Sequence, residues 1–151
     1  MIERSSLPSR FFSGEEQLMI RRAIEAAESG TSGEIRIHLD RRCAGDPLDA
    51  ARAWFDKLGM RATARRNGVL LYLAIADRKF ALFGDGAIHG VLAEGTWERL
   101  RDAMIAEFAQ GRFAEGIVGA IGAIGAALKT HFPHEAGDKD ELSDELSTSD
   151  E

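Results

Sequence analysis

The feature that most constrains the fold of this chain is an apolar run at residues 68–76, which reads Gly-Val-Leu-Leu-Tyr-Leu-Ala-Ile-Ala. Polar residues bound it on both sides, with Arg66 and Asn67 before it and Asp77 and Arg78 after it. An apolar run of this length between polar boundaries is typical of a strand that is covered on both faces. The sequence therefore predicts a central strand with other elements packed on each side of the sheet.

Two further strands are predicted beside the central one. Residues 34–40 alternate between polar and apolar side chains, which places Ile35, Ile37 and Leu39 on one face of a half-buried strand. Residues 79–83 follow the central run after a two-residue turn, so these two strands are expected to form a hairpin. A helical segment separates the first strand from the central one. Such crossovers are right-handed and make the two strands parallel.

Helices are predicted around these strands from their starting signals. Ser13 and Glu16 form the S-x-x-E pattern of a capping box, and Asp46 followed by Pro47 is a second helix start. We expect helices over residues 13–29, 46–58, 88–92, 96–110 and 113–131. This order of elements predicts an α/β fold, with a small mixed β-sheet of three to four strands flanked by helices on both faces as an α/β/α sandwich.

The last predicted helix carries Gly116, Gly119, Gly122 and Gly125 at a spacing of three. Each glycine costs about 0.8–1 kcal/mol of helix stability relative to alanine. Their recurrence therefore predicts that this helix packs closely against a neighbouring helix or the sheet.

Length and charge predict a single domain with an acidic tail. A chain of 151 residues that is 44% hydrophobic can build one ordinary core. Residues 1–11 are expected to be an N-terminal extension, residues 12–134 the domain, and residues 135–151 a flexible tail that the core does not need. The tail carries eight acidic residues and one lysine, which gives it a net charge of −7. The net charge of the whole chain is −6, so residues 1–134 carry about +1. A near-neutral body with an acidic tail argues against nucleic-acid binding.

Cysteine content and hydropathy favour a cytoplasmic protein. Cys43 is the only cysteine, so an intramolecular disulfide is excluded. The first residues lack the apolar core of a signal peptide. The longest uncharged run covers the thirteen residues 116–128, against the roughly 20 needed to cross a bilayer, so no membrane span is expected.

Polar residues gather at the two ends of the predicted sheet. Beyond the carboxyl ends of the two parallel strands lie Asp40, Asp46 and Asp77. Open α/β sheets usually bind ligands at this end. The opposite end is richer in oxygen-bearing side chains, and the sequence leaves the choice between the two ends open.

The candidate cation ligands at the opposite end are Glu34, Asn67, Asp85 and Ser32. Carboxylate, amide and hydroxyl oxygens are the ligands that Ca²⁺ and Mg²⁺ prefer, and loops from separate strands must converge to supply them. Each residue also has a structural explanation, because asparagine and aspartate are common in turns. The sequence thus predicts a Ca²⁺ or Mg²⁺ site here as one of two interpretations.

Arg66 and His89 are candidates for anion binding and proton transfer at the same end. The structural alternatives are a solvated loop arginine and a histidine on a helix surface. His38, on the polar face of the first strand, is a weaker candidate than His89. No C-x-x-C, H-E-x-x-H or phosphate-binding glycine loop occurs in the sequence, which leaves an enzyme assignment open.

Several segments in register resemble the TPM domain family. They are Phe12-Ser13 with Glu16, Thr31-Ser32-Gly33-Glu34-Ile35-Arg36, Arg66-Asn67-Gly68-Val69-Leu70-Leu71-Tyr72-Leu73, Asp77-Arg78-Lys79 and Gly84-Asp85-Gly86-Ala87-Ile88-His89. The resemblance extends over roughly residues 12–145. It implies a fold of helices around a small mixed sheet and a soluble, bacterial type of member.

The family resemblance implies more than one function. Its members include a thylakoid-lumen acid phosphatase, a photosystem II repair protein and a receptor auxiliary protein, and some bacterial members bind Ca²⁺ or Mg²⁺. We therefore expect a domain that binds a divalent cation, with weak phosphatase activity as an extension of that hypothesis. The alternative is a non-catalytic interaction module that binds a protein partner.

Overall fold

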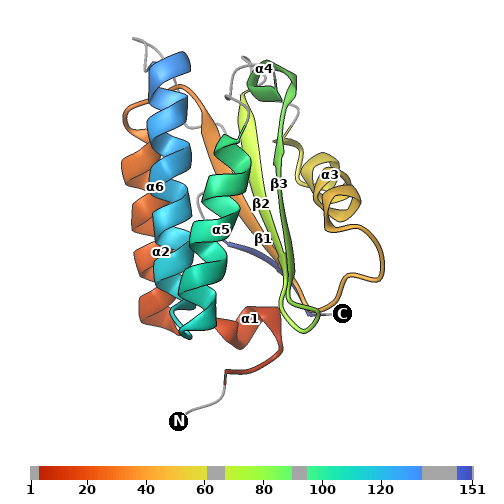
Figure 1. The fold of residues 1–151 in the computed structure, drawn as a ribbon. Coiled ribbons are helices and arrows are strands. Elements are labelled where there is room, and N and C mark those ends of the chain that lie inside the picture. The colour runs from red at the N-terminus through yellow and green to blue at the C-terminus, as the bar shows by residue number, and fades with distance from the viewer. Residues whose placement is uncertain (1–3, 61–66, 90–94, 134–145, 151) are drawn as a thin grey trace.

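The structure, a computed structural model, describes residues 4–60, 67–89, 95–133 and 146–150. Its sheet has the strand order β3-β2-β1-β4 (Figure 1). The strands are β1 (Glu34–Asp40), β2 (Gly68–Ala74), β3 (Lys79–Gly84) and β4 (Ser147–Ser149). The helices are α1 (Pro8–Phe11), α2 (Gly14–Glu28), α3 (Pro47–Lys57), α4 (Gly86–His89), α5 (Thr96–Ala109) and α6 (Phe113–His131).

The predicted central strand is confirmed. β2 is parallel to β1, with register from Glu34 opposite Gly68 to Asp40 opposite Ala74, and antiparallel to β3. All of its residues are buried, because both of its faces are covered. The hairpin connection is longer than predicted, since β2 ends at Ala74 and a four-residue turn precedes Lys79.

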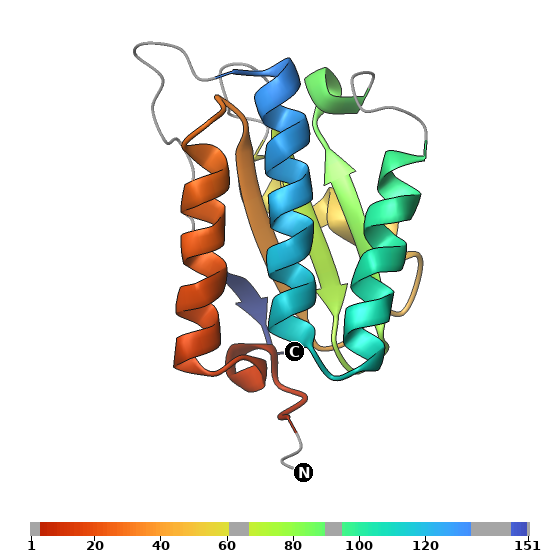
Figure 2. The same cartoon turned by 60° about the vertical axis from the view of Figure 1, so that its left-hand side comes forward.

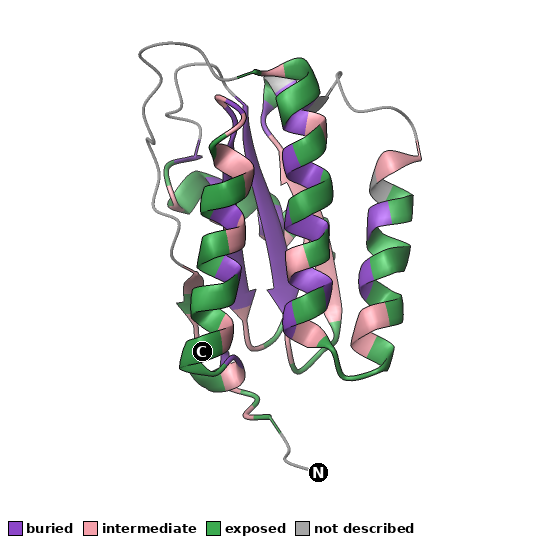
Figure 3. Ribbon diagram, turned by 90° about the vertical axis from the view of Figure 1, so that its left-hand side faces the viewer, coloured by how far each residue is buried: buried purple, intermediate pink, exposed green. Residues whose placement is uncertain are grey.

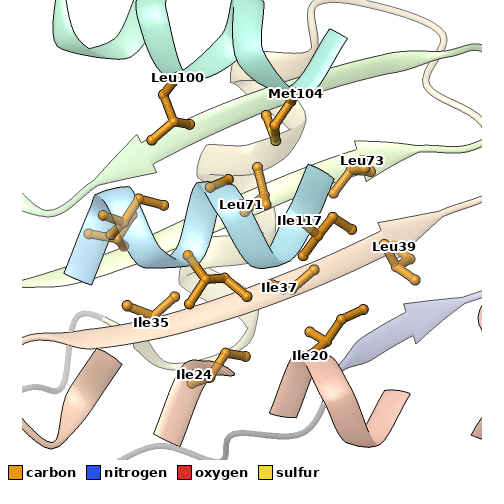
Figure 4. Close-up of a cluster of buried hydrophobic side chains, with 14 of the residues drawn as sticks. Ile20, Ile24, Ile35, Ile37, Leu39, Leu71, Leu73, Leu100, Met104 and Ile117 are labelled. Atoms are coloured by element: carbon orange, nitrogen blue, oxygen red, sulfur yellow. The ribbon is translucent and has the colours of Figure 1, made fainter. Parts of the chain in front are cut away.

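Helices cover both faces of the sheet, as predicted. On one face the apolar side chains of β1 and β2 pack against α2, α5 and α6, and α3 covers the other face (Figures 1 and 2). The main core contains Ile35, Ile37 and Leu39 from β1 and residues such as Leu71 and Met104 around them (Figure 4). The helices are buried only along their inner sides (Figure 3). The α/β/α sandwich therefore follows from the alternation in β1 and the apolar run in β2.

The predicted starts of α2 and α3 are also confirmed, whereas α4 begins at Gly86, two residues before the predicted start. Ser13 accepts a hydrogen bond from the backbone N–H of Glu16, and the Glu16 carboxylate accepts one from the Ser13 N–H, which completes the capping box of α2. Asp46 caps α3 by accepting from the Leu48 N–H at 2.9 Å, with Pro47 at the first helical position. The local signals therefore set the starts of α2 and α3.

Two of the four glycines of α6 explain its close packing. A Cβ atom at Gly116 would lie 2.7 Å from the Phe108 ring of α5, and one at Gly125 would lie 2.7 Å from the Ala27 Cβ of α2. Gly119 and Gly122 have nothing within 4 Å, so close approach does not explain them. The predicted packing therefore holds at both ends of the helix, where α5 and α2 press against it.

Within the described residues, α6 is also the one helix that is long and apolar enough to cross a membrane. Its mean hydropathy over that stretch is 1.3, and 44% of the stretch is buried inside the structure. The buried side chains include Ile117, Ile121 and Ile124, which belong to the main core. Packing between α2 and α5 therefore accounts for much of its apolar character.

The expectation of a flexible tail does not hold for residues 146–150. Ser147, Thr148 and Ser149 pair in parallel with His38, Leu39 and Asp40, so β4 extends the sheet beyond β1. Leu146 packs against the main core, and Asp150 accepts hydrogen bonds from Ser9. Residues 134–145 lie outside the described part of the chain. The three-residue strand was missed because Ser-Thr-Ser has no apolar periodicity.

Candidate functional site

The first candidate site lies where β1 and β2 begin and β3 ends, which we name the Asp85 end. The Glu34 N–H donates to the Asn67 carbonyl at 3.4 Å, and the Asp85 N–H donates to the Gly68 carbonyl at 2.9 Å. Three strands therefore bring Glu34, Asn67 and Asp85 to one place. This adjacency follows from strand directions that the sequence predicts correctly.

The polar side chains at the Asp85 end are deeply buried. Glu34 is 3% exposed, Asn67 1% and Asp85 0%. The Asn67 amide Nδ2 donates to Ser32 Oγ at 3.1 Å, which joins the fourth predicted residue to the group. One Asp85 oxygen accepts from the Gly86 N–H at 2.7 Å. Burial of this many polar groups is costly unless they are satisfied by partners or by a ligand.

The donor set at the Asp85 end fits a hard cation by its chemistry. It consists of two carboxylates, the amide oxygen of Asn67 and the hydroxyl of Ser32, and all four are oxygen ligands of the kind that Ca²⁺ and Mg²⁺ take. No cluster of three or more His, Cys, Asp or Glu side chains suited to a metal occurs among the described residues. A site here would therefore combine two acidic ligands with neutral oxygens.

The side chains of the two other predicted residues, Arg66 and His89, are not described by the structure. Arg66 lies outside the described residues. His89 is the last residue of α4, which follows the Asp85 loop directly, and the structure does not describe its side chain. Their anion-binding and proton-transfer roles stay predictions.

The opposite end of the sheet, which we name the Asp40 end, contains a hydrogen-bonded cluster that the sequence did not predict. Asp40 Oδ2 accepts from the Tyr72 hydroxyl at 2.7 Å and from Trp54 Nε1 at 3.1 Å. Its other oxygen, Oδ1, lies 2.8 Å from His38 Nε2. The second ring nitrogen of His38 lies 2.8 Å from Ser147 Oγ in β4. Asp40 thus joins β1, β2, α3 and β4.

The environment of this cluster changes the ionisation of two side chains. Burial lowers the pKa of His38 below its ordinary value, and the nearby Asp40 carboxylate opposes this effect only in part. Burial also raises the pKa of the Tyr72 phenol, and its hydrogen bond to Asp40 adds to the increase. The imidazole stacks on Trp54 with ring centroids 3.7 Å apart. His38 is therefore held as a neutral, fully buried ring.

The other acidic residues of the Asp40 end also have structural roles. Asp46 caps α3, and Asp77 Oδ2 accepts from the Cys43 N–H at 2.7 Å. The Lys79 ammonium donates to the Cys43 and Gly45 carbonyls, which fastens the loop after β1. These bonds account for the polar residues that the sequence placed at this end.

One signal in the sequence could have indicated the His38 cluster. His38 and Asp40 are two residues apart in β1, so they share a face of the sheet, and that face also presents Tyr72 of the parallel neighbour. Trp54 faces inward from α3, the helix that covers this face. Ser147 could not be found in this way, because the chain between it and the body carries no pattern that places β4.

Comparisons with known proteins agree with this architecture. A family model described as the TPM domain matches residues 7–127. The NMR structure of the BA42 protein from the psychrophilic bacterium Bizionia argentinensis is 39% identical, with a TM-score of 0.86, and the alignment covers 93% of this chain and 97% of that chain. No curated protein matches the chain.

Two more distant solved structures share the fold. The N-terminal domain of the cg2496 protein from Corynebacterium glutamicum is 15% identical with a TM-score of 0.61, covering 78% of this chain and 74% of that one. The N-terminal domain of a P. gingivalis protein is 21% identical with a TM-score of 0.66, covering 82% of each chain. Because the family model matches most of the chain and BA42 is similar over nearly all of it, this chain belongs to the TPM domain family.

Proposed function

We propose that this TPM domain binds a divalent cation, Ca²⁺ or Mg²⁺, at the Asp85 end. The observation that carries the proposal is the burial of Glu34, Asn67 and Asp85 at one point where three strands meet. Two carboxylates give the site a charge that complements a divalent ion, and Asn67 and Ser32 add neutral oxygens. Water or a bound anion would complete the six to eight ligands that Ca²⁺ takes.

The hydrogen bonds at this end orient the proposed cation ligands. Asn67 donates through its Nδ2 to Ser32, which directs the amide and leaves its oxygen as an acceptor. The Asp85 backbone is fixed to β2 by its N–H bond to Gly68, so its side chain starts from a rigid strand end rather than a free loop. Ligands held on strands need less ordering when an ion binds.

Weak phosphatase activity is an extension of this proposal. A bound divalent ion would offset the negative charge of a phosphate group. His89, at the end of α4, and Arg66 are the predicted residues for proton transfer and anion binding. The extension rests on the family resemblance, whereas the cation site rests on the buried oxygens.

Thermal unfolding with and without cation tests the proposal. An ion that binds only the folded state stabilises it by about 2.7 kcal/mol at a hundredfold excess over the dissociation constant. For a chain of this size that raises the melting temperature by about 5–10 °C. Asp85→Asn should lose most of the shift, because it removes a charged ligand at nearly constant size.

The matched control is Asp77→Asn, which makes the same change at an exposed residue of the opposite end. It should keep the full cation-induced shift. An undiminished shift in Asp85→Asn would contradict the assigned site, and no shift in the wild type would favour the interaction module instead. A phosphatase assay with and without chelator, run on the same variants, tests the catalytic extension separately.

A further inference from the structure

A cleft of about 790 Å³ opens at the Asp40 end, on the face of the sheet opposite to the His38 cluster. Its walls come from α1, the ends of β1 and β2, the start of β3, the last turns of α5 and the start of α6. Cavities that bind small molecules usually measure about 300–1,000 Å³ and are mainly apolar. The cleft is thus large enough for a ligand and distinct from the Asp85 end.

Five of the eight phenylalanines of the chain line this cleft and form a connected row. Ring centroids are 6.1 Å apart between Phe80 and Phe108, 5.5 Å between Phe108 and Phe113, and 5.2 Å between Phe113 and Phe11. Phe12 continues the row at 4.9 Å from Phe11. The row gives the cleft a continuous apolar wall from β3 to α1.

Most of this apolar wall is not fully covered by the protein. Phe12 is buried, but the other four rings are only partly buried, and Ile105 at the rim is 48% exposed. Contiguous apolar surface in a concave site is a common mark of ligand or partner binding. The surface of the cleft is therefore suited to an apolar ligand.

The charges at the opening are positive. Arg78 and Lys79 line the cleft, and no acidic residue is among the described residues that line it. The Lys79 ammonium is already bound by the Cys43 and Gly45 carbonyls, so its stem rather than its charge faces the cleft. Arg78 is exposed in the turn after β2. Its guanidinium is suited to a carboxylate or phosphate at the mouth.

We propose that the cleft binds a monomeric amphiphile with one long apolar chain and an anionic head group, of the fatty-acid type. The chain lies along the row of phenylalanine rings between α5 and β3. The carboxylate lies at the opening, where Arg78 supplies the complementary charge. This function is independent of the cation site, since no residue is shared between them.

Titration calorimetry with laurate below its micelle concentration tests the proposal. Each buried methylene should tighten binding about fourfold, so laurate should bind about fifteen times more tightly than decanoate. Dodecyltrimethylammonium has the same chain with a positive head and should bind more weakly than laurate. Equal binding of the two head groups, or no binding of laurate, would overturn the proposal.

Two pairs of variants locate the site. Ala109 lines the cleft and is exposed, so Ala109→Trp should fill the opening and reduce laurate affinity at least tenfold without loss of folding. Ala103→Trp, on an exposed position of the same helix outside the cleft, is its control. Arg78→Gln should weaken laurate binding by at most about fivefold, as expected for an exposed charge pair, whereas Arg22→Gln on α2 should not weaken it.

A further variant, with an unfolding measurement on every variant, separates loss of binding from loss of folding. Ile105→Glu places a negative charge at the exposed rim and should also weaken laurate binding, with thermal unfolding of each variant recorded in parallel. Unchanged affinity in both Ala109→Trp and Ile105→Glu would place laurate elsewhere and refute the cleft. Binding to vesicles of phosphatidylglycerol without binding of monomeric laurate would instead show a membrane surface, and would refute the monomeric ligand.

Discussion

The two ends of the sheet use acidic residues in opposite ways. At the Asp40 end, hydrogen-bond donors converge on a carboxylate: a phenol, an indole and an imidazole surround Asp40. At the Asp85 end, the strand ends bring the buried residues Glu34, Asn67 and Asp85 together through backbone hydrogen bonds, and the Asn67 amide donates to Ser32. The first arrangement satisfies the carboxylate from within the chain. The second is the basis of the proposed cation site.

This difference shows why burial of an acidic residue does not by itself indicate a ligand. Asp40 is partly exposed and Asp85 fully buried, yet the partly exposed Asp40 is the residue that a phenol, an indole and an imidazole surround. The nature of the neighbouring groups separates the two cases. The donors around Asp40 stabilise the fold, whereas the proposal of a cation at the Asp85 end rests on the kind of oxygen ligands that its buried residues carry.

Asp40→Ala should give the largest effect, because it leaves the buried Tyr72 hydroxyl, Trp54 indole and His38 ring without their acceptor. We expect the free energy of unfolding to fall by about 3–5 kcal/mol, as when one member of a buried polar cluster is removed. Urea denaturation measures it. Asp77→Ala, which removes an exposed acceptor at the same end, should cost about 1 kcal/mol. Equal losses would mean that the cluster is not the main structural element of the Asp40 end.

Deletion of residues 137–151 should lower the free energy of unfolding by about 2 kcal/mol. The deletion removes the partial burial of Leu146 and the hydrogen bonds that Ser147 and Asp150 make to the body. For a chain of this length the melting temperature should fall by about 4–8 °C. Thr148→Ala, at an exposed position of β4, is the control and should have almost no effect. An unchanged melting temperature after the deletion would restore the expectation of a dispensable tail.

Tyr72→Phe tests a single hydrogen bond of the Asp40 end. The change removes the hydroxyl that donates to Asp40 at 2.7 Å and should cost about 1–2 kcal/mol. The same change in the Asp40→Ala background should cost less, because the hydroxyl has already lost its partner there, and denaturation of the four proteins measures the coupling. Equal costs in both backgrounds would show that the contribution of the Tyr72 hydroxyl does not depend on Asp40.

The pH dependence of stability should depend on His38, and this is the smallest of the expected effects. Because its pKa is lowered in the folded state, the unfolded chain binds a proton more readily as the pH falls below about 6.5. The contribution of neutral His38 to the free energy of unfolding is therefore present above that pH, and it is lost as the pH falls toward the pKa of His38 in the folded state. Melting temperatures measured from about pH 7.5 to about pH 5 should fall less steeply in His38→Gln than in wild type. Parallel curves for the two proteins would contradict this role.

The central part of the fold could be predicted because each signal is local or follows from strand direction. The apolar run of β2 requires cover on both faces, and the Ser13 and Asp46 caps mark the starts of α2 and α3. The same reasoning brought Glu34, Asn67 and Asp85 to one end of the sheet, where the structure places them. Whether they bind a cation stays a prediction, because it depends on an ion that is not part of the chain.

The parts that could not be predicted depend on contacts between distant segments. His38 was interpreted as a residue of a polar strand face, but α3 covers that face and Trp54 stacks on the ring. Alternation in one strand shows which residues share a face, not what covers them. The pairing of β4 with β1 depends on contacts that Leu146 and Ser147 make with distant parts of the domain. The three small polar residues of β4 give no periodic signal for this pairing.

The place of β4 beside β1 also sets an order of events during synthesis. His38 and its partner Ser147 are 109 residues apart, so at about 5–20 residues per second the ribosome needs roughly 5–20 s to make the second after the first. During that interval β2 can pair with one edge of β1, but the strand for the other edge does not yet exist. Open sheet edges recruit other strands, so the nascent domain passes through a period in which this edge of β1 is open to them. The least conspicuous strand of the structure is therefore the one whose arrival covers the last three residues of that edge.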